Sequence, residues 1–388
     1  MLFVSQFFCA VGFAAPQVTS VRVGIHETKT RVVVEVGSMV RFETFTLPNP
    51  YRVVVDMSEV TWAPELRSPP SGGVVSGMRF GLFKPGTSRI VLDTSGPVQV
   101  AKSFILPPAE SGHPFRLVFD LISTTERSFM SAYNAPRAAT PEVSAPQIPE
   151  AKAARKSEKR LVVIDPGHGG VDPGAMSRSG VWEKNIVLDF SRELRRQLLG
   201  TGRFDVQLTR DNDVFIRLRD RIAIARRAGA DLFISVHADS IGNPSVRGTS
   251  VYTLSETGSD KEAEMLASKE NRADLIAGVD LNARSDEVVN ILIDLAQRET
   301  MNESAVFAKI LVDEIGKRRE MLRNTHRFAG FAVLKAPDVP SVLMELGYLS
   351  NSQDEKMLRS PAERRRMATS IVDAVDAYFE RQQAFNRP

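Results

Sequence analysis

The feature that most constrains the fold of this chain is a change of composition at residues 123–159. This stretch is rich in Ala, Pro, Ser and charged residues and has few large apolar side chains. Such a segment buries too little apolar surface to offset the entropy lost on folding, so we expect it to be a linker. A chain of 388 residues also exceeds the usual size of one domain. We therefore predict two domains, over 17–122 and 160–388.

Residues 1–16 form a short apolar run that ends in small residues before Pro16. The run is too short to span a bilayer and is similar to the apolar core and cleavage region of a secretory signal, although a basic start is missing. A buried first strand is the alternative. Cys9, the single cysteine, lies in this run. If the run is removed on export, the rest of the chain needs no disulfide.

The overall charge says little about the partner. The formal net charge is +3 at pH 7 and the hydrophobic fraction is 43%, as in many soluble globular proteins. A mild positive charge suits an anionic polymer such as a cell wall. The sequence has no basic motif with interleaved aromatic residues, so it does not support nucleic-acid binding. No segment approaches the roughly 20 apolar residues needed to span a membrane.

Residues 17–122 have the pattern of an all-β domain. Apolar and polar residues alternate over 21–26, and turn signals such as Pro85-Gly86 recur at short intervals. One pattern, Arg followed by three apolar residues and an acid, occurs four times, at 31–35, 52–56, 89–93 and 116–120. Alternate residues of a strand share a face, so Arg and acid would lie outside. Four such strands predict a pseudo-symmetric pair of sheets.

Residues 160–388 have the pattern of an α/β domain. Leu161–Ile164 is a continuous apolar run that stops at Asp165-Pro166-Gly167, as a buried parallel strand does. Strands alternating with amphipathic helices predict a sheet with helices on both faces. The expected strands, about six, are 161–164, 206–208, 232–236, 251–254, 331–334 and 341–346. The expected helices cover 186–198, 218–225 and 367–378.

Residues 256–302 interrupt this alternation and are long for a connection. They contain apolar residues at helical spacing, notably Val288, Ile291, Leu292 and Leu295. We expect a helical insert that is either a lid or packing decoration.

Four residues with catalytic chemistry lie near predicted strand or helix ends. His168 follows the first strand, His237 ends a later one, Glu183 begins the helix after the His168 loop, and Glu345 lies near the end of another strand. Functional sites of α/β folds collect at the carboxyl ends of strands, so these side chains can face one point.

Two histidines and a carboxylate with one open position are the usual ligands of a catalytic zinc ion. A second carboxylate, for which Glu345 is suited, can move the proton of the attacking water. The spacing is not a strong local signature, and isolated histidines are more often structural. His26, His113 and His326 have no such companions in the sequence and are interpreted as structural or surface residues. The motifs HExxH and GxSxG and a phosphate-binding loop are absent from the sequence.

Several ordered motifs carry a resemblance to a known family. They include VVIDPGHGGVDPGA, WEKNIVLDFSRELRRQL, LFISVHADS and FAVLKAPDVPSVLMELGYLSN. Together they resemble the N-acetylmuramoyl-L-alanine amidases of the Amidase_3 fold over residues 160–380. The resemblance implies Zn²⁺ bound by His168, Glu183 and His237, with Glu345 as catalytic acid/base.

Two segments, the β domain and the insert, resemble parts of the Gram-negative cell-division amidases. The β domain is similar to an AMIN domain, which implies peptidoglycan binding, the periplasm as the location and a role in daughter-cell separation. The insert resembles a regulatory helix in which a glutamate blocks the zinc until an activator with a LytM-like domain displaces it. We expect Glu270 in that role, with Glu287 as the alternative. A different zinc peptidase of the wall, such as a carboxypeptidase, and a non-catalytic wall-binding protein remain alternatives.

Overall fold

A computed structural model describes residues 15–66, 71–108, 113–135, 159–279, 293–319 and 321–385. The chain divides into two compact units, one up to Ala135 and one from Pro136 onward. The predicted signal segment lies almost entirely outside the described residues.

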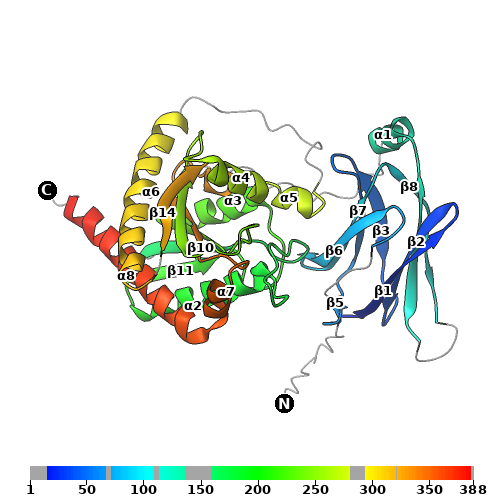
Figure 1. Ribbon diagram of the computed structural model, residues 1–388, viewed down its shortest axis with the longest axis horizontal. Helices are drawn as coiled ribbons and strands as arrows, with labels where there is room; N and C mark the ends of the chain where they lie inside the picture. The colour runs from blue at the N-terminus through cyan, green and yellow to red at the C-terminus, as the bar shows by residue number, and fades with distance from the viewer. Residues whose placement is uncertain are drawn as a thin grey trace, which may run out of the picture. The chain divides into compact units, whose positions relative to one another are not determined.

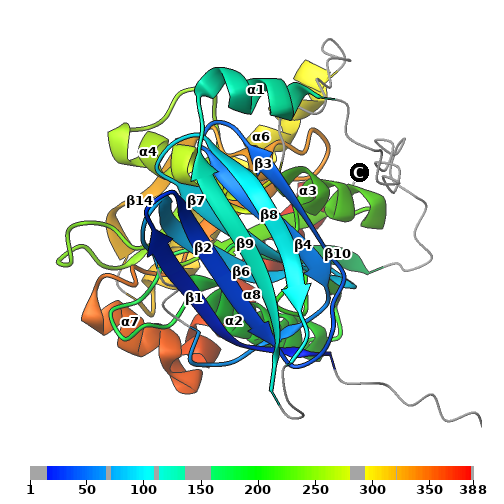
Figure 2. The ribbon, with the colours of Figure 1, turned by 90° about the vertical axis from the view of Figure 1, so that its right-hand side faces the viewer.

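The first unit is an all-β pair of sheets, as predicted (Figure 2). A core of valines from both sheets, including Val34, Val53 and Val55, is fully buried between them. The five-stranded sheet has the order β5 (Thr61–Trp62), β1 (Gln17–His26), β2 (Lys29–Val36), β9 (Phe115–Ser123) and β8 (Val98–Leu106). The four-stranded sheet has the order β3 (Phe42–Leu47), β4 (Arg52–Ser58), β7 (Thr87–Thr94) and β6 (Val75–Lys84).

The repeated Arg-to-acid pattern sets up ion pairs between neighbouring strands rather than within one. β2 and β9 pair in antiparallel register with Arg31 opposite Asp120, and β4 and β7 pair with Arg89 opposite Asp56. The Nε of Arg31 lies 2.6 Å from Oδ1 of Asp120, and the Nε of Arg89 lies 2.6 Å from Oδ1 of Asp56. Each sheet thus contains one adjacent pair of the four repeated strands, which agrees with the predicted pseudo-symmetry.

The start of the predicted linker at residue 123 is wrong. Residues Glu126–Asn134 form helix α1, and the hydroxyl of Thr125 caps it by accepting from the amide of Ser128. Phe129 is buried and its ring lies 5.0 Å from that of Tyr51 in an edge-to-face contact. One buried aromatic residue therefore attaches α1 to the β unit, a tertiary contact that the polar composition conceals.

The second unit confirms the predicted α/β class (Figure 1). Helices α2 (Glu183–Gly200), α6 (Ile293–Gly316) and α8 (Pro361–Phe385) cover one face, and α3 (Leu218–Ala228) and α4 (Lys261–Glu270) cover the other. The described strands form a sheet in the order β11 (Phe204–Leu208), β10 (Arg160–Pro166), β12 (Leu232–His237), β15 (Ser341–Glu345), β13 (Thr249–Leu254) and β14 (Met321–Ala329). In this sheet order the first four strands run parallel, whereas β13 runs antiparallel to β15.

One predicted strand is misplaced. The edge strand β14 is Met321–Ala329, whereas Ala332–Leu334, inside the predicted strand 331–334, form the short 3-10 helix η1. Phe331 is fully buried and its ring lies 5.3 Å from that of Tyr252. The apolar run is buried as a turn over the sheet, and apolar runs of this length do not distinguish the two structures by pattern alone.

The predicted C-terminal boundary of the insert, residue 302, is too far along the chain. Within 256–302 the structure has α4, the short helix α5 (Ala273–Ile276) and the start of α6. Helix α6 continues unbroken to Gly316 and contributes Phe307 and Leu311 to the main core. Residue 302 is therefore inside a core helix, while Glu287 and the residues Val288, Ile291 and Leu292 lie outside the described part of the chain. No helix in that described part is long and apolar enough to cross a membrane.

Replacing Asp120 with Asn should destabilise the first unit. Hydrogen bonds from Arg31 and Lys29 hold the pKa of Asp120 well below its ordinary range. Because this pKa is lower in the folded chain than in the unfolded chain, the ionised carboxylate stabilises the fold at pH values above about 4, the ordinary carboxyl pKa. This stabilisation is lost as the pH falls below that value. At pH 7 we expect the free energy of unfolding to fall by about 1.5–3 kcal/mol, typical of a charged hydrogen bond.

Urea denaturation followed through Trp62, in a Trp182→Phe background, measures this loss. Glu27→Gln, in the exposed turn between β1 and β2, is the control and should change nothing. The difference between Asp120→Asn and the parent chain should shrink below pH 4; a difference that grows there would contradict the ion-pair explanation.

Candidate metal centre

The ends of three neighbouring strands bring the predicted site residues together. β12 lies between β10 and β15, and His237, the last residue of β12, is paired in register with Glu345, the last residue of β15. His168 follows the end of β10 by two residues. Glu183 is the first residue of α2, which follows the His168 loop. All four side chains are buried, with exposures from 0% to 6%.

Two glycines allow the close packing of this site. A Cβ atom on Gly167 would lie 2.5 Å from Cε1 of His237. A Cβ on Gly174, which has a φ of +67°, would lie 2.6 Å from Cδ2 of His168 and 2.8 Å from Oε2 of Glu183. All three distances are shorter than the 3.0 Å that Cβ atoms keep from their neighbours, so the glycines of the DPGHGGVDPG motif make room for the site.

Asp172 orients the first histidine. Its Oδ2 lies 2.9 Å from Nδ1 of His168. With the proton assigned to Nδ1, the Nε2 atom of His168 presents its lone pair to the centre of the site. The ring of His237 lies 4.9 Å away at an angle of 77° and turns its Nδ1 toward the same centre.

Glu183 joins the two histidines. Its Oε2 lies 3.2 Å from Nε2 of His168, and its Oε1 lies 3.3 Å from Nδ1 of His237. The backbone amides of Ala175 and Ala238 donate to the same oxygens at 2.9 Å and 2.8 Å. These donors fix the carboxylate and favour its charged form.

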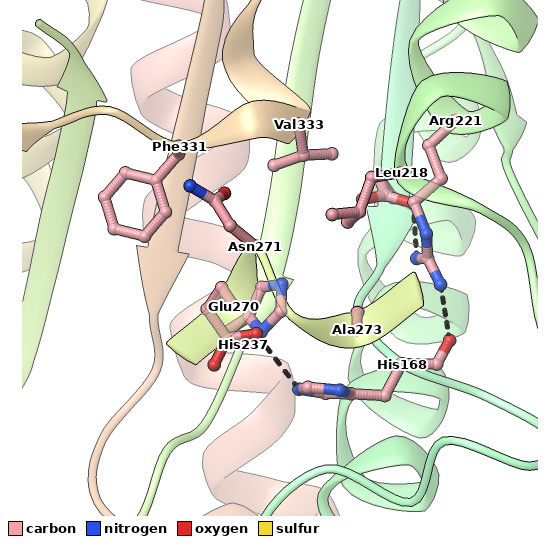
Figure 3. A pocket seen from close by; sticks show the side chains of 11 residues that line it. His168, Leu218, Arg221, His237, Glu270, Asn271, Ala273, Phe331 and Val333 are labelled. Atoms are coloured by element: carbon pink, nitrogen blue, oxygen red, sulfur yellow. Dashed lines mark hydrogen bonds and ion pairs between the residues drawn. The ribbon is translucent and has the colours of Figure 1, made fainter. Parts of the chain in front are cut away.

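Glu270, the last residue of α4, also enters this space and lies beside His237 (Figure 3). Its Oε2 lies 3.5 Å from Nε2 of His168 and 3.3 Å from Nδ1 of His237. The cavity at this point has a volume of about 10 Å³ and is lined by both histidines, Glu270 and Arg221, among others. Such a cavity holds about one water molecule or ion.

The electrostatics of the site favour a cation. Burial alone would lower the pKa of His168, but Glu183, Asp172 and Glu270 outweigh it and raise that pKa well above the ordinary value. Burial, with Glu183 nearby, raises the pKa of Glu270. Several carboxylates therefore surround two imidazoles in a buried space, which is costly unless a positive charge is shared among them.

The donor set fits a zinc ion. Among the described residues, His168, His237 and Glu270 form a group whose ligand atoms lie within 4.8 Å of one another. Within the described part of the chain, Nε2 of His168, Nδ1 of His237 and Oε1 of Glu270 are buried without a hydrogen-bond partner. Imidazole nitrogens and carboxylate oxygens are the ligands that zinc takes in proteins, and the Asp172 contact is typical of a zinc-bound histidine.

Glu345 lies beside this group. The amide of Asp239 donates to its Oε2 at 2.8 Å, while its Oε1 is buried and has no hydrogen-bond partner among the residues that the structure describes. Burial, followed by repulsion from Asp239, Glu183 and Glu270, raises the pKa of Glu345 well above the ordinary carboxyl value.

Some residues of the site were not singled out from the sequence. Asp172 is four residues after His168 in the quoted motif, so its position was a usable signal. The ion pair between Lys269 and Asp239 ties α4 to the loop after β12 and joins residues 30 apart, which spacing does not reveal. His326, predicted to be structural, contacts the hydroxyl of Thr253 through Nε2 at 3.0 Å.

Comparison with known proteins identifies the family. A family profile for N-acetylmuramoyl-L-alanine amidase (Amidase_3) matches residues 162–377, and an AMIN domain profile matches residues 35–119. The first match covers more than half of the chain, so this chain belongs to the N-acetylmuramoyl-L-alanine amidase family. The resemblance seen in the motifs is thereby confirmed.

Two relatives that are more than 30% identical to this chain agree with this assignment. The N-acetylmuramoyl-L-alanine amidase AmiC of Neisseria meningitidis serogroup B is 36% identical, over 94% of this chain and 90% of its own. The AmiC of Escherichia coli O6:H1 is 34% identical, over 98% of this chain and 93% of its own. Among solved structures, the amidase AmiC2 of Nostoc punctiforme is 28% identical, covers 58% of this chain and 99% of its own, and has a TM-score of 0.43.

Replacing Gly167 with Ala should destabilise the second unit. The new methyl group would overlap the His237 ring, so the loop or the ring must move. Overpacking of this kind costs about 1–3 kcal/mol, measurable by thermal or urea unfolding. Gly200→Ala is the matched control, because a Cβ there meets no atom of the described residues within 4 Å outside its own helix. Equal stability of the two variants would contradict the close packing described here.

Proposed function

We propose that this chain is a zinc-dependent hydrolase that cleaves the amide bond between N-acetylmuramic acid and L-alanine in peptidoglycan. The observation that carries the proposal is the pair of unpartnered imidazole nitrogens, on His168 and His237, facing a buried carboxylate at the strand ends. Family membership supports the choice of substrate bond.

His168, Glu183 and His237 are the proposed zinc ligands, since the Glu183 carboxylate contacts both imidazoles. Asp172 keeps His168 in the tautomer that binds. A zinc ion held there would act as a Lewis acid, and it would lower the pKa of the attacking water to near neutrality and polarise the amide carbonyl. The backbone at the neighbouring glycines packs closely against the ligand side chains. This packing leaves the ligands little freedom to move, so the set is preorganised.

Glu345 is the proposed proton carrier. Its buried and unpartnered Oε1 can take a proton from the attacking water, whose oxygen adds to the lactyl carbonyl carbon. When the C–N bond breaks, the same oxygen can deliver that proton to the nitrogen of the departing L-alanine. The hydrogen bond from Asp239 holds the other oxygen in place.

In the conformation described here the site is proposed to be autoinhibited by Glu270. The cavity of about 10 Å³ next to the histidines admits no peptide amide. The Glu270 carboxylate occupies the direction from which a substrate or fourth ligand would approach both histidines. The Lys269–Asp239 ion pair, and the bond from the amide of Ala332 to Asn271 at 2.7 Å, hold the end of α4 in this place.

The remaining roles concern location and partners. We propose that the AMIN domain anchors the enzyme to peptidoglycan, that it acts in the periplasm during daughter-cell separation, and that a protein with a LytM-like domain displaces α4. Sequence similarity to AmiC proteins over more than nine tenths of the chain supports this proposal.

Replacing Glu270 with Ala should raise the basal activity on purified peptidoglycan, because it removes the carboxylate that blocks the histidines. Release of soluble wall fragments measures the rate, and zinc content should stay near that of the parent chain. Glu264→Gln, on the exposed side of α4, is the control. Unchanged or lower activity of a folded, zinc-loaded Glu270→Ala variant would exclude this residue as the blocking ligand.

Replacing Glu345 with Gln in the Glu270→Ala background should lower the rate by about 10²–10⁴-fold, the usual contribution of a positioned acid or base. Zinc should remain bound, whereas His168→Ala in the same background should lose both zinc and activity. Mass analysis identifies the bond that is cut, since an amidase releases stem peptides that begin with L-alanine. Shorter products would indicate a peptidase, and full activity of Glu345→Gln would overturn its role.

A further inference from the structure

We propose that Arg221 is a positioning residue for His168: it fixes the backbone from which the histidine reaches the zinc site. This inference rests on the proposed ligand role of His168. Arg221 belongs to α3 and is 2% exposed. Among the described residues, its side chain donates to Asp165 and to the backbone carbonyls of Ile216, Pro166 and His168, not to a proposed ligand atom. Its Nη2 donates to the backbone carbonyl of His168 at 2.7 Å (Figure 3).

The His168 backbone needs such support because its conformation is unfavourable. Its φ is +58°, in the left-handed region that residues with a side chain adopt rarely. The next two residues, Gly169 and Gly170, also have positive φ but carry no Cβ. Strained backbone persists at functional sites only where surrounding contacts hold it, and the bond to the His168 carbonyl is one of these contacts.

Two buried arginines hold three successive carbonyl groups of this loop. Arg221 donates from Nη1 to Pro166 at 2.8 Å as well as to His168. Arg210 donates from Nε to Pro166 at 3.0 Å and from Nη2 to Gly167 at 2.7 Å. The loop from the end of β10 to the first proposed ligand is thus fixed at every carbonyl. Small shifts of this loop would move Nε2 of His168 away from the other ligands.

Asp165 fixes the guanidinium group of Arg221 in turn. Its Oδ1 accepts from Nη1 of Arg221 at 2.8 Å and from the hydroxyl of Thr209 at 2.6 Å. Its Oδ2 accepts from the hydroxyl of Ser235 at 2.9 Å. Asp165 is fully buried, so the pair is desolvated and stable only with these partners complete. Strands β10 and β12 therefore determine where Arg221 points.

The arrangement requires a guanidinium group. Arg221 uses three nitrogens, since Nε also donates to the carbonyl of Ile216 at 3.0 Å. A planar fork can serve acceptors in several fixed directions, whereas the ammonium group of lysine is a single point of charge. Arg221→Lys preserves the charge next to Asp165 but should lose the bond to the His168 carbonyl.

The test compares the zinc affinity of the full chain and of Arg221→Lys by competition with a chromogenic chelator. We expect about 10–100-fold weaker binding, the usual effect of losing a group that orients a metal ligand. Substitution of cobalt for zinc gives a second readout, since a displaced histidine should alter the visible bands. Arg226→Lys, on the same helix but paired with Asp338 at 2.8 Å near the surface, is the matched control.

Zinc affinity within about twofold of the parent and an unchanged cobalt spectrum for Arg221→Lys would overturn the inference. If Arg221→Lys does not fold, Thr209→Val is the second variant, because it removes one hydrogen-bond partner of Asp165. We expect it to weaken zinc binding by about threefold to tenfold. Zinc affinity equal to that of the parent chain would contradict the role of Arg221. His168→Ala separates the two claims. If His168→Ala binds zinc like the parent chain, the ligand assignment itself fails. If His168→Ala loses zinc but Arg221→Lys binds it like the parent chain, only the role of Arg221 is excluded.

Discussion

The site depends on the register between β10, β12 and β15. Because His237 and Glu345 are paired residues at the ends of adjacent parallel strands, one proposed ligand and one proposed proton carrier face the same point. β10 lies on the other side of β12 and delivers His168 two residues past its end. A shift of one residue in either pairing would turn a side chain to the opposite face of the sheet. The main core, which buries strand residues such as Val162, Ile234 and Val342 against α2, α6 and α8, fixes this register.

Charge is the second constraint on the structure. Asp172, Glu183 and Glu270 contact two imidazoles in a buried space. Asp165, which is also buried, forms an ion pair with Arg221. Carboxylates thus surround the proposed metal position, whereas the positive charge of Arg221 lies against the backbone that carries His168. Glu270 comes from α4, the helix of the proposed regulatory segment, which the ion pairs Lys269–Asp239 and Arg327–Glu262 tie to the rest of the domain.

The sequence predicted the two-sheet class of the first unit, the α/β class of the second and the residues that converge at the strand ends. Strand ends and glycine-rich turns are local signals, so His168, Glu183, His237 and Glu345 could be singled out before the fold was known. The sequence did not predict α1, whose Phe129 ring packs against Tyr51, and it placed a strand at 331–334 where the 3-10 helix η1 lies. Arg221 was not identified either, because its importance depends on carbonyl groups 53 and 55 residues away. Contacts of that kind follow from tertiary structure and not from local pattern.

The most direct test of a zinc centre at the strand ends is a crystal structure of the zinc-loaded full chain with anomalous data at the zinc edge. We predict one strong peak at about 2.0–2.2 Å from Nε2 of His168, Nδ1 of His237 and a carboxylate oxygen of Glu183. In the resting chain a carboxylate oxygen of Glu270 should complete the coordination. A peak elsewhere, or none between the two histidines at full zinc loading, would contradict the proposed centre.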